Sequence, residues 1–221
     1  MHDLGTLGGD QSSASAINEI GHVVGSAWAA DRLNHAFLWT PEVGMIDLGT
    51  LGGYSSDAVD INDRDEVTGR SYNPSSERRA FHWANGVMTD LGAFAGGEPE
   101  PADINNRGQI VGSGGPGAFL WSAECGMRLL ADSDMPSHAA AINDAGFVTG
   151  SITFEGREDV GQVERAAVWT VGSSCTGPST LLPDLGSGNS EGSAINAAGT
   201  VAGDSLSAVG RIHAVLWKSL P

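Results

Sequence analysis

The chain has 221 residues, including 32 Gly, and its 11 Lys and Arg against 27 Asp and Glu give a formal net charge of -16 at pH 7. The field of so acidic a protein repels phosphate backbones and anionic lipid headgroups, which excludes nucleic acids and membrane surfaces as partners. The longest apolar runs are of strand length, well short of the roughly 20 residues that a spanning helix requires, and we expect no signal peptide in this chain.

One pattern occurs five times along the chain. It begins with an Ile-Asn pair, and a glycine stands seven residues after each Asn. Each copy continues to a second motif that ends in tryptophan, such as HAFLW at 35–39 and HAVLW at 213–217. Successive pairs are 38 to 53 residues apart, a period typical of propellers and other repeat arrays. The Ile-Asn pairs stand at 17–18, 61–62, 104–105, 142–143 and 195–196, and the glycines are Gly25, Gly69, Gly112, Gly150 and Gly203.

The first copy predicts four antiparallel strands, named A to D here. Residues 13–17 alternate small and apolar side chains and end at an Asn/Gly turn, after which residues 22–27 return. Residues 35–40 and 45–49 form the second hairpin. Four such strands in each of five copies predict an all-β fold, a five-bladed β-propeller.

The two ends of the chain predict ring closure. The fifth copy stops after strand C at 213–217, while residues 1–5 (MHDLG) match the strand D residues 45–49 (MIDLG) of the first copy. We therefore expect the N-terminal strand to complete the last blade. The chain, 1–221, is predicted to be a single domain. Its blades are expected at about 11–49, 54–92, 98–131, 137–186, and 190–221 plus 1–5.

The blocks HAFLW, DLGTLGG (3–9 and 47–53) and AIN followed by VVG resemble the HAF-repeat family, whose members are mostly regarded as extracellular and bacterial. The resemblance covers the whole chain. It implies an extracellular or periplasmic location, but it attaches no catalytic or binding residue to the motif itself.

The repeated residues are expected to have structural roles. The five strand-C tryptophans should fill the space between blades, the glycines should allow close contact between blades, and the Asn side chains should cap the turn between strands A and B. Ser190 lies in a G-x-S-x-G pattern, but it aligns with Ser12, Ser56 and Ser137. It is therefore interpreted as a repeat serine rather than a nucleophile.

Two cysteines fall in outer turns of neighbouring copies. A disulfide requires Cα atoms within about 7 Å, and the outer edges of adjacent repeats usually diverge. Free thiols at Cys125 and Cys175 are therefore the first expectation and a bridge the alternative. The spacing of Cys and His indicates no zinc site.

Functional residues are expected where the copies differ while the frame is kept. The position four residues before each anchor Ile carries mostly charged or ionisable side chains. Asp10 and Glu98 stand shortly before this position in their copies. Together these residues predict a negatively charged rim at the central channel. Carboxylates that converge without cationic partners favour a bound cation, and their oxygens suit Ca²⁺; the alternative is that they point into water. The predicted metal ligands are Asp57, Glu100 and Glu191, and the predicted catalytic residues are Asp57, Glu100 and His138.

The loops between strands B and C lie at the same rim and vary in length. Aromatic and basic side chains in such loops predict a collar that holds a ligand, although solvated loops explain them equally well. The predicted binding residues are Trp28, Arg32, Tyr72, Arg78 and Arg157.

These patterns favour two functions of different classes. The first is a hydrolase that acts on a small ester, lactone or glycoside at the channel mouth, where a divalent cation polarises a carbonyl or activates water. The second is a non-catalytic ligand-binding or surface-scaffold module that holds a small molecule or saccharide. The predicted acid ring places the hydrolase narrowly first, and we expect a monomer.

Overall fold

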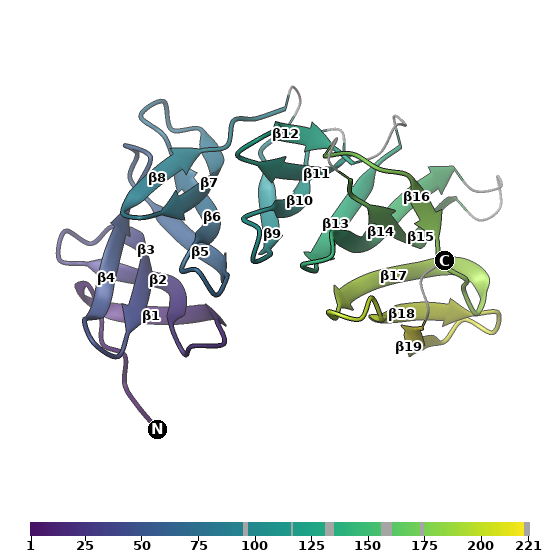
Figure 1. Cartoon of the computed structure of the whole chain (residues 1–221), viewed down its shortest axis with the longest axis horizontal. Coiled ribbons are helices and arrows are strands. Elements are labelled where there is room, and N and C mark those ends of the chain that lie inside the picture. The colour runs from purple at the N-terminus through teal and green to yellow at the C-terminus, as the bar shows by residue number, and fades with distance from the viewer. Residues whose placement is uncertain (95–96, 116, 131–134, 156–160, 173–174, 219–221) are drawn as a thin grey trace. The chain divides into compact units, whose positions relative to one another are not determined.

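The structure, a computed structural model, describes residues 1–221 except 95–96, 116, 131–134, 156–160, 173–174 and 219–221. Its described residues form strands and the turns that join them (Figure 1). The strands make five antiparallel sheets of three or four strands, which confirms the predicted all-β class. No helix in the described residues could cross a membrane. The chain divides into two compact units, Met1–Gly108 and Gln109–Pro221.

Unit 1 contains two four-stranded sheets and one further strand. The sheet orders are β1-β2-β3-β4 and β5-β6-β7-β8, so every strand pairs with its neighbours in sequence, as strands A to D of the first two copies are predicted to do. The strands are β1 (Gly8–Ile17), β2 (Val23–Ala29), β3 (Asn34–Thr40), β4 (Gly44–Gly49), β5 (Ser56–Ile61), β6 (Val67–Tyr72), β7 (Arg78–Ala84), β8 (Val87–Asp90) and β9 (Glu100–Ile104).

Unit 2 contains the remaining strands. β10, β11 and β12 pair in that order, followed by the sheets β13-β14-β15-β16 and β17-β18-β19. The last sheet has three strands, and residues 1–6 of unit 1 lie in no strand. The strands are β10 (Ile110–Gly114), β11 (Gly117–Ser122), β12 (Gly126–Leu129), β13 (Ser137–Ile142), β14 (Phe147–Glu155), β15 (Gln162–Thr170), β16 (Ser179–Leu181), β17 (Gly186–Ile195), β18 (Val201–Ser207) and β19 (Ile212–Trp217).

The repeated glycine belongs with a bulge in strand A. The pairing register between strands A and B shifts by one residue in the first, second, fourth and fifth sheets. A Cβ on Gly25 would collide with the carbonyl oxygen of Ser13, and one on Gly150 with that of His138. Both collisions occur within a single sheet. The expectation that these glycines serve contact between blades is therefore wrong, because they make room for the bulge.

The hydrophobic core lies between successive sheets. In unit 1, Leu38 of the first sheet and Phe81 of the second belong to one buried cluster. In unit 2, Leu120 of the third copy and Trp169 of the fourth belong to another. Trp169 is fully buried, whereas Trp28, which lies outside the repeat motif, is 39% exposed. Each sheet thus buries a face against its neighbour within a unit, as propeller blades do.

The repeated Asn caps its own turn and also joins adjacent copies. Oδ1 of Asn62 accepts the backbone N–H groups of Arg64 and Glu66 at 2.9 and 3.0 Å, which confirms the predicted cap. Its Nδ2 donates to the carbonyl oxygen of Asn105 in the next copy at 3.0 Å. Asn18 reaches the carbonyl oxygen of Asn62 in the same way at 3.1 Å. One side chain therefore satisfies both its own turn and the next.

The repeat serine makes a second link between copies. Its Oγ accepts the backbone N–H of an alanine in strand C of the preceding copy, which buries the hydroxyl with its hydrogen bond satisfied. The pairs are Ser56 with Ala36, Ser137 with Ala118, and Ser190 with Ala166, at 2.8, 2.9 and 3.0 Å.

Residues 3–12 repeat the local structure of residues 47–56. Asp3 accepts the backbone N–H of Gly5 at 3.0 Å, and Asp47 that of Gly49 at 2.8 Å. The hydroxyl of Ser12 donates to the carbonyl oxygen of Gly5 at 2.8 Å, and the equivalent bond in the second copy is 2.6 Å. The start of the chain therefore has the conformation of a connector between strand D and strand A.

The DLG sequence at 184–186 has a different role. The backbone N–H of Leu182 donates to the carbonyl oxygen of Ala166 at 2.8 Å, and the leucines that follow β8 and β12 make the equivalent bonds in the second and third copies. Leu182 is buried, whereas Leu185 is 45% exposed. Asp184 accepts the N–H of Gly186 at 2.6 Å. In the DLGTLGG blocks the equivalent bond is made by threonine, which accepts the N–H of the glycine two residues later. Because β17 already begins at Gly186, the fifth sheet starts earlier than predicted.

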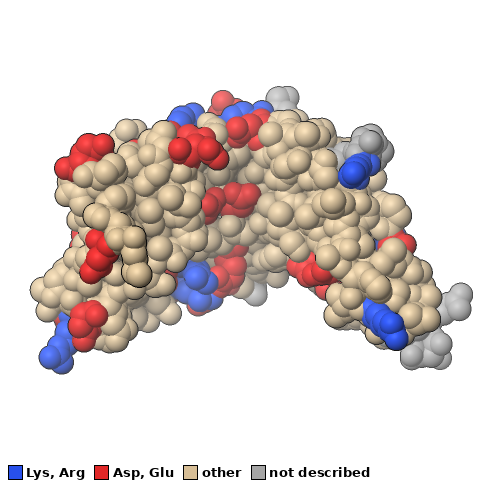
Figure 2. All heavy atoms as spheres, turned by 90° about the horizontal axis from the view of Figure 1, so that it is seen from below, with Lys and Arg blue, Asp and Glu red and all other residues tan. Residues whose placement is uncertain are grey.

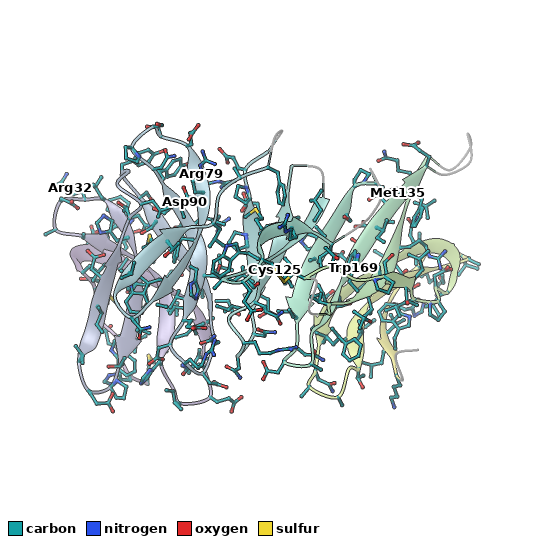
Figure 3. All side chains as sticks on the ribbon, turned by 45° about the horizontal axis from the view of Figure 1, so that its top comes forward. Arg32, Arg79, Asp90, Cys125, Met135 and Trp169 are labelled. Atoms are coloured by element: carbon teal, nitrogen blue, oxygen red, sulfur yellow. A yellow bond between two sulfur atoms is a disulfide. The ribbon has the colours of Figure 1, made fainter. Side chains whose placement is uncertain are left out.

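Cys125 and Cys175 form a disulfide with their Cα atoms 6.3 Å apart, so the first expectation of free thiols is wrong (Figure 3). Cys125 lies in the turn between β11 and β12, while Cys175 follows β15 and its backbone N–H donates to the carbonyl oxygen of Gly172. Cys175 is buried in the core cluster of the third and fourth copies. The chain after β15 therefore folds back toward the third copy instead of diverging from it.

Candidate functional site

The predicted acidic residues and the predicted histidine are divided between the two units. Asp57 and Glu100 lie in unit 1, at the starts of β5 and β9, and His138 and Glu191 lie in unit 2, on β13 and β17. Asp and Glu side chains are spread over both units on the face shown in Figure 2. Among the described residues, no group of three or more His, Cys, Asp or Glu is placed to hold a metal ion.

In unit 1, Glu100 is paired with arginines. Its Oε2 lies 2.9 Å from Nη1 of Arg70, and its Oε1 accepts Nη2–H of Arg78. Arg78 also donates through Nε to Glu98 at 2.8 Å. Burial acts to lower the pKa of Arg78, but Glu100 and Glu98 together raise it, so the guanidinium stays charged. The premise of a carboxylate without a cationic partner is therefore wrong for Glu100.

Asp57 is held by an amide. Its Oδ1 accepts Nδ2–H of Asn34 at 2.8 Å, and Asn34 also donates to the carbonyl oxygen of Ser56 at 3.2 Å. Asn34 begins β3 of the preceding copy, so this contact ties the first two sheets together. The carboxylate of Asp57 thus takes part in packing between copies.

In unit 2, a pocket of about 300 Å³ gathers three carboxylates. Glu191 and Asp204 are direct partners on β17 and β18, and Glu164 lines the same pocket. The carboxylate of Glu164 accepts the hydroxyl hydrogen of Ser151 at 2.5 Å. Like charges that face each other across a strand pair destabilise it.

The predicted catalytic residue His138 lies on β13. Its Nδ1 atom is buried and has no hydrogen-bond partner among the described residues.

A second pocket, of about 480 Å³, lies in unit 1 and joins two of the predicted binding residues. Trp28 at the end of β2 and Arg32 in the loop after it line this pocket together with Asp10 of β1. Arg32 is labelled in Figure 3. In the part of the chain that the structure describes, neither Asp10 nor Arg32 has an ion-pair partner. An exposed aromatic face with one acceptor group and one donor group beside it can hold and orient a small polar ligand.

The backbone shapes the Trp28 pocket. A Cβ on Gly9 would collide with the carbonyl oxygen of Trp28, so the two strands approach closely only because this residue is glycine. The loop after β2 is closed by hydrogen bonds between Ala29 and Leu33 at 2.9 Å and between Arg32 and Ala29 at 3.0 Å. Arg32 has a φ of 66°, a left-handed conformation at the tip of this turn.

Two further predicted binding residues, Tyr72 and Arg78, do not line this pocket. Tyr72 stacks on Tyr54, with ring centroids 4.3 Å apart and an interplanar angle of 22°. Arg78 is occupied by Glu98 and Glu100, and the predicted residue Arg157 lies outside the described residues. Of the predicted collar residues that the structure describes, Trp28 and Arg32 line one pocket together.

Sequence reasoning placed Asp10 at an acidic rim and did not single out Tyr54. Both stand seven residues before the anchor Ile of their copy, at a position where the copies carry different side chains. Sequence reasoning compared the copies only at the position four residues before the anchor. A comparison at the position seven residues before it could have identified Asp10 and Tyr54.

In comparisons with known proteins, no family model matches the chain and no curated protein matches it. The resemblance to the HAF-repeat family stays a prediction from the motifs.

Proposed function

We propose that this chain is a non-catalytic ligand-binding module that holds a small polar molecule in the Trp28 pocket. The observation that carries the proposal is the half-exposed indole of Trp28 beside Asp10 and Arg32, in a concave space of about 480 Å³. That volume lies within the range of about 300–1,000 Å³ in which proteins bind small molecules.

The hydrolase hypothesis receives less support. It requires carboxylates that are free to bind a cation or to move a proton, and Glu100 is held by two arginines. Asp57 is engaged by Asn34 in a contact between copies. Asp57 and Glu100, the two predicted catalytic residues of unit 1, thus take part in contacts between copies.

We also propose that the five sheets close into a five-bladed propeller in which residues 1–5 complete the last sheet. Three features support closure. The last sheet has three strands, residues 3–5 have the conformation that follows a strand D, and apolar side chains at the ends are exposed. Ile17 is 67% and Leu216 is 62% exposed, whereas Ile61 and Leu120, their equivalents in inner copies, are buried.

An extracellular or periplasmic location is proposed as well. The disulfide between Cys125 and Cys175 supports it, because disulfides persist in oxidising compartments and are rare in the cytosol.

The binding proposal is tested by titrating the protein with a panel of neutral mono- and disaccharides and neutral polar metabolites while the heat of binding is recorded by calorimetry. We expect at least one compound to bind wild type, and Trp28→Ala to weaken that binding at least tenfold. Val87→Ala, at an exposed apolar residue of the same unit, is the matched control. Binding that survives Trp28→Ala unchanged would overturn the proposal, and turnover of esters, lactones or glycosides by wild type would favour the hydrolase.

A further inference from the structure

The second copy of the repeat contains the same positions that form the Trp28 pocket. Asp10 and Tyr54 each stand seven residues before an anchor Ile, and Trp28 and Tyr72 each stand eleven residues after it. An aromatic side chain near the end of strand B is thus present in both copies, exposed in Trp28 and half-buried in Tyr72. The two copies differ in what stands opposite it.

The backbone around the two aromatic residues is the same. A Cβ on Gly53 would collide with the carbonyl oxygen of Tyr72, as one on Gly9 would with that of Trp28. The turn after Tyr72 has the hydrogen bonds of the first copy, and Ser76 has a φ of 60° where Arg32 has 66°. The second copy therefore serves as an internal comparison for the first.

In the second copy the aromatic face is already covered. The ring of Tyr54 lies over that of Tyr72 at 4.3 Å, nearly parallel. In the first copy the covering position is Asp10, whose short carboxylate leaves the space that a ring fills in the second copy, and the pocket is found there. Tyr54 thus indicates the shape of a group that would fit the first copy, a six-membered ring that lies flat on the aromatic side chain.

The polar groups at the pocket decide between an aromatic and a saccharide ring. Asp10 offers carboxylate oxygens that accept from hydroxyl groups, and Arg32 offers guanidinium hydrogens that donate to them. An aromatic ring without hydroxyls would leave both groups unused, and a phenol has one hydroxyl where a pyranose has several. The charges of Asp10 and Arg32 are opposite, and the net charge of -16 disfavours an anionic ligand, so the ring is neutral.

Resting on the proposed binding function, we propose that the Trp28 pocket takes one neutral pyranose ring, stacked on the indole as Tyr54 is stacked on Tyr72. The second copy is then a closed version of the same site, in which Tyr54 occupies the place of the sugar.

The test exchanges the two covering residues. Asp10→Tyr should plug the first site, and Tyr54→Asp combined with Ser76→Arg should open a second one. The probes are methyl hexopyranosides, with sorbitol as the open-chain control and p-cresol as the aromatic control. Binding is followed by NMR titration, which resolves weak sites separately through the indole N–H signal of Trp28 and signals of the second copy. Glu42→Tyr, in an exposed turn, is the matched control for an added tyrosine.

We expect at least one methyl hexopyranoside to bind wild type at one site and sorbitol and p-cresol to bind at least tenfold more weakly. Asp10→Tyr should weaken binding at least tenfold, Glu42→Tyr should leave it unchanged, and the double variant should bind at two sites. Binding of p-cresol or sorbitol in place of pyranosides, or full binding by Asp10→Tyr, would overturn the inference. If no pyranoside binds but another compound requires Trp28, this inference fails while the proposed binding function stands.

Discussion

His82 occupies a strand-C position where other copies carry leucine or valine. It is mostly buried, and burial lowers the pKa of its imidazole, with Glu66 acting in the opposite direction. A lowered folded-state pKa means that the unfolded chain binds the proton more readily. The buried neutral imidazole of His82 therefore costs no free energy of unfolding above pH ~6.5. As the pH falls from there through the folded-state pKa, the free energy of unfolding decreases.

We therefore expect His82→Leu to reduce the loss of stability between pH 7 and pH 5. The leucine keeps the apolar contact and removes the proton uptake that accompanies unfolding. Thermal melts of wild type and variant at several pH values measure the effect, where each kcal/mol corresponds to about 2–4 °C for a chain of this size. An identical pH dependence in both proteins would show that His82 does not contribute to acid sensitivity.

Individual residues show what the sequence could and could not reveal. Recurrence identified the Asn cap and the repeat serine, because such positions follow from alignment alone. The variable loops between strands B and C identified the pocket residues Trp28 and Arg32. Recurrence could not reveal that Glu100 meets Arg70 and Arg78, since three residues from two copies come together only when the sheets pack.

The bulge in strand A is the element most sensitive to a single added methyl group. Gly150→Ala places its Cβ against the carbonyl oxygen of His138, which is backbone and cannot move without breaking the pairing of β13 with β14. We expect a loss of about 1–3 kcal/mol, typical of overpacking. Gly172→Ala is the control, because a Cβ there meets no atom within 4 Å. Equal unfolding free energies for the two variants, measured in denaturant, would contradict the bulge argument.

The disulfide joins elements of the third and fourth copies. It closes a loop with a sequence separation of 50, and removing such a cross-link costs about 2–4 kcal/mol. Cys125→Ser with Cys175→Ser should lower the unfolding midpoint accordingly, and reducing agent should lower that of wild type but not of the double variant. A reducing agent that leaves the wild-type midpoint unchanged would contradict a stabilising bond.

Strands were more predictable than their connections. The four strands of the first copy follow from alternation and turn residues. The structure confirms strands B to D within two residues, while β1 begins at Gly8, earlier than the predicted residue 13. The letters DLG at 184–186 match those of strand D in the first copy, but the buried leucine at the corresponding place in the fourth copy is Leu182, directly after β16. Whether Leu182 or Leu185 enters the core depends on the path of the preceding chain. A motif of three letters does not reveal that path.

At the scale of the whole molecule, five copies of one pattern predict five sheets, and five sheets are present. Closure is a different kind of statement, because it concerns which surfaces meet rather than which strands form. The similarity of residues 1–5 to 45–49 makes a strand exchange between the two ends of the chain possible, but the free energy of closure depends on burial at the ends.

Leu4 provides the test of closure. In the DLG blocks of the first and second copies, the equivalent leucines Leu48 and Leu91 are each only 6% exposed. If residues 1–5 complete the last sheet, Leu4 is buried in the same way and Leu4→Ala should cost about 2–5 kcal/mol, as Leu91→Ala should. If residues 1–5 remain unpaired, Leu4→Ala should stay within about 0.5 kcal/mol of wild type. Denaturant melts of the two variants compare these values directly. Deletion of residues 1–5 extends the test, because it would leave β19 as an unpaired edge that invites association between molecules, which sedimentation would detect.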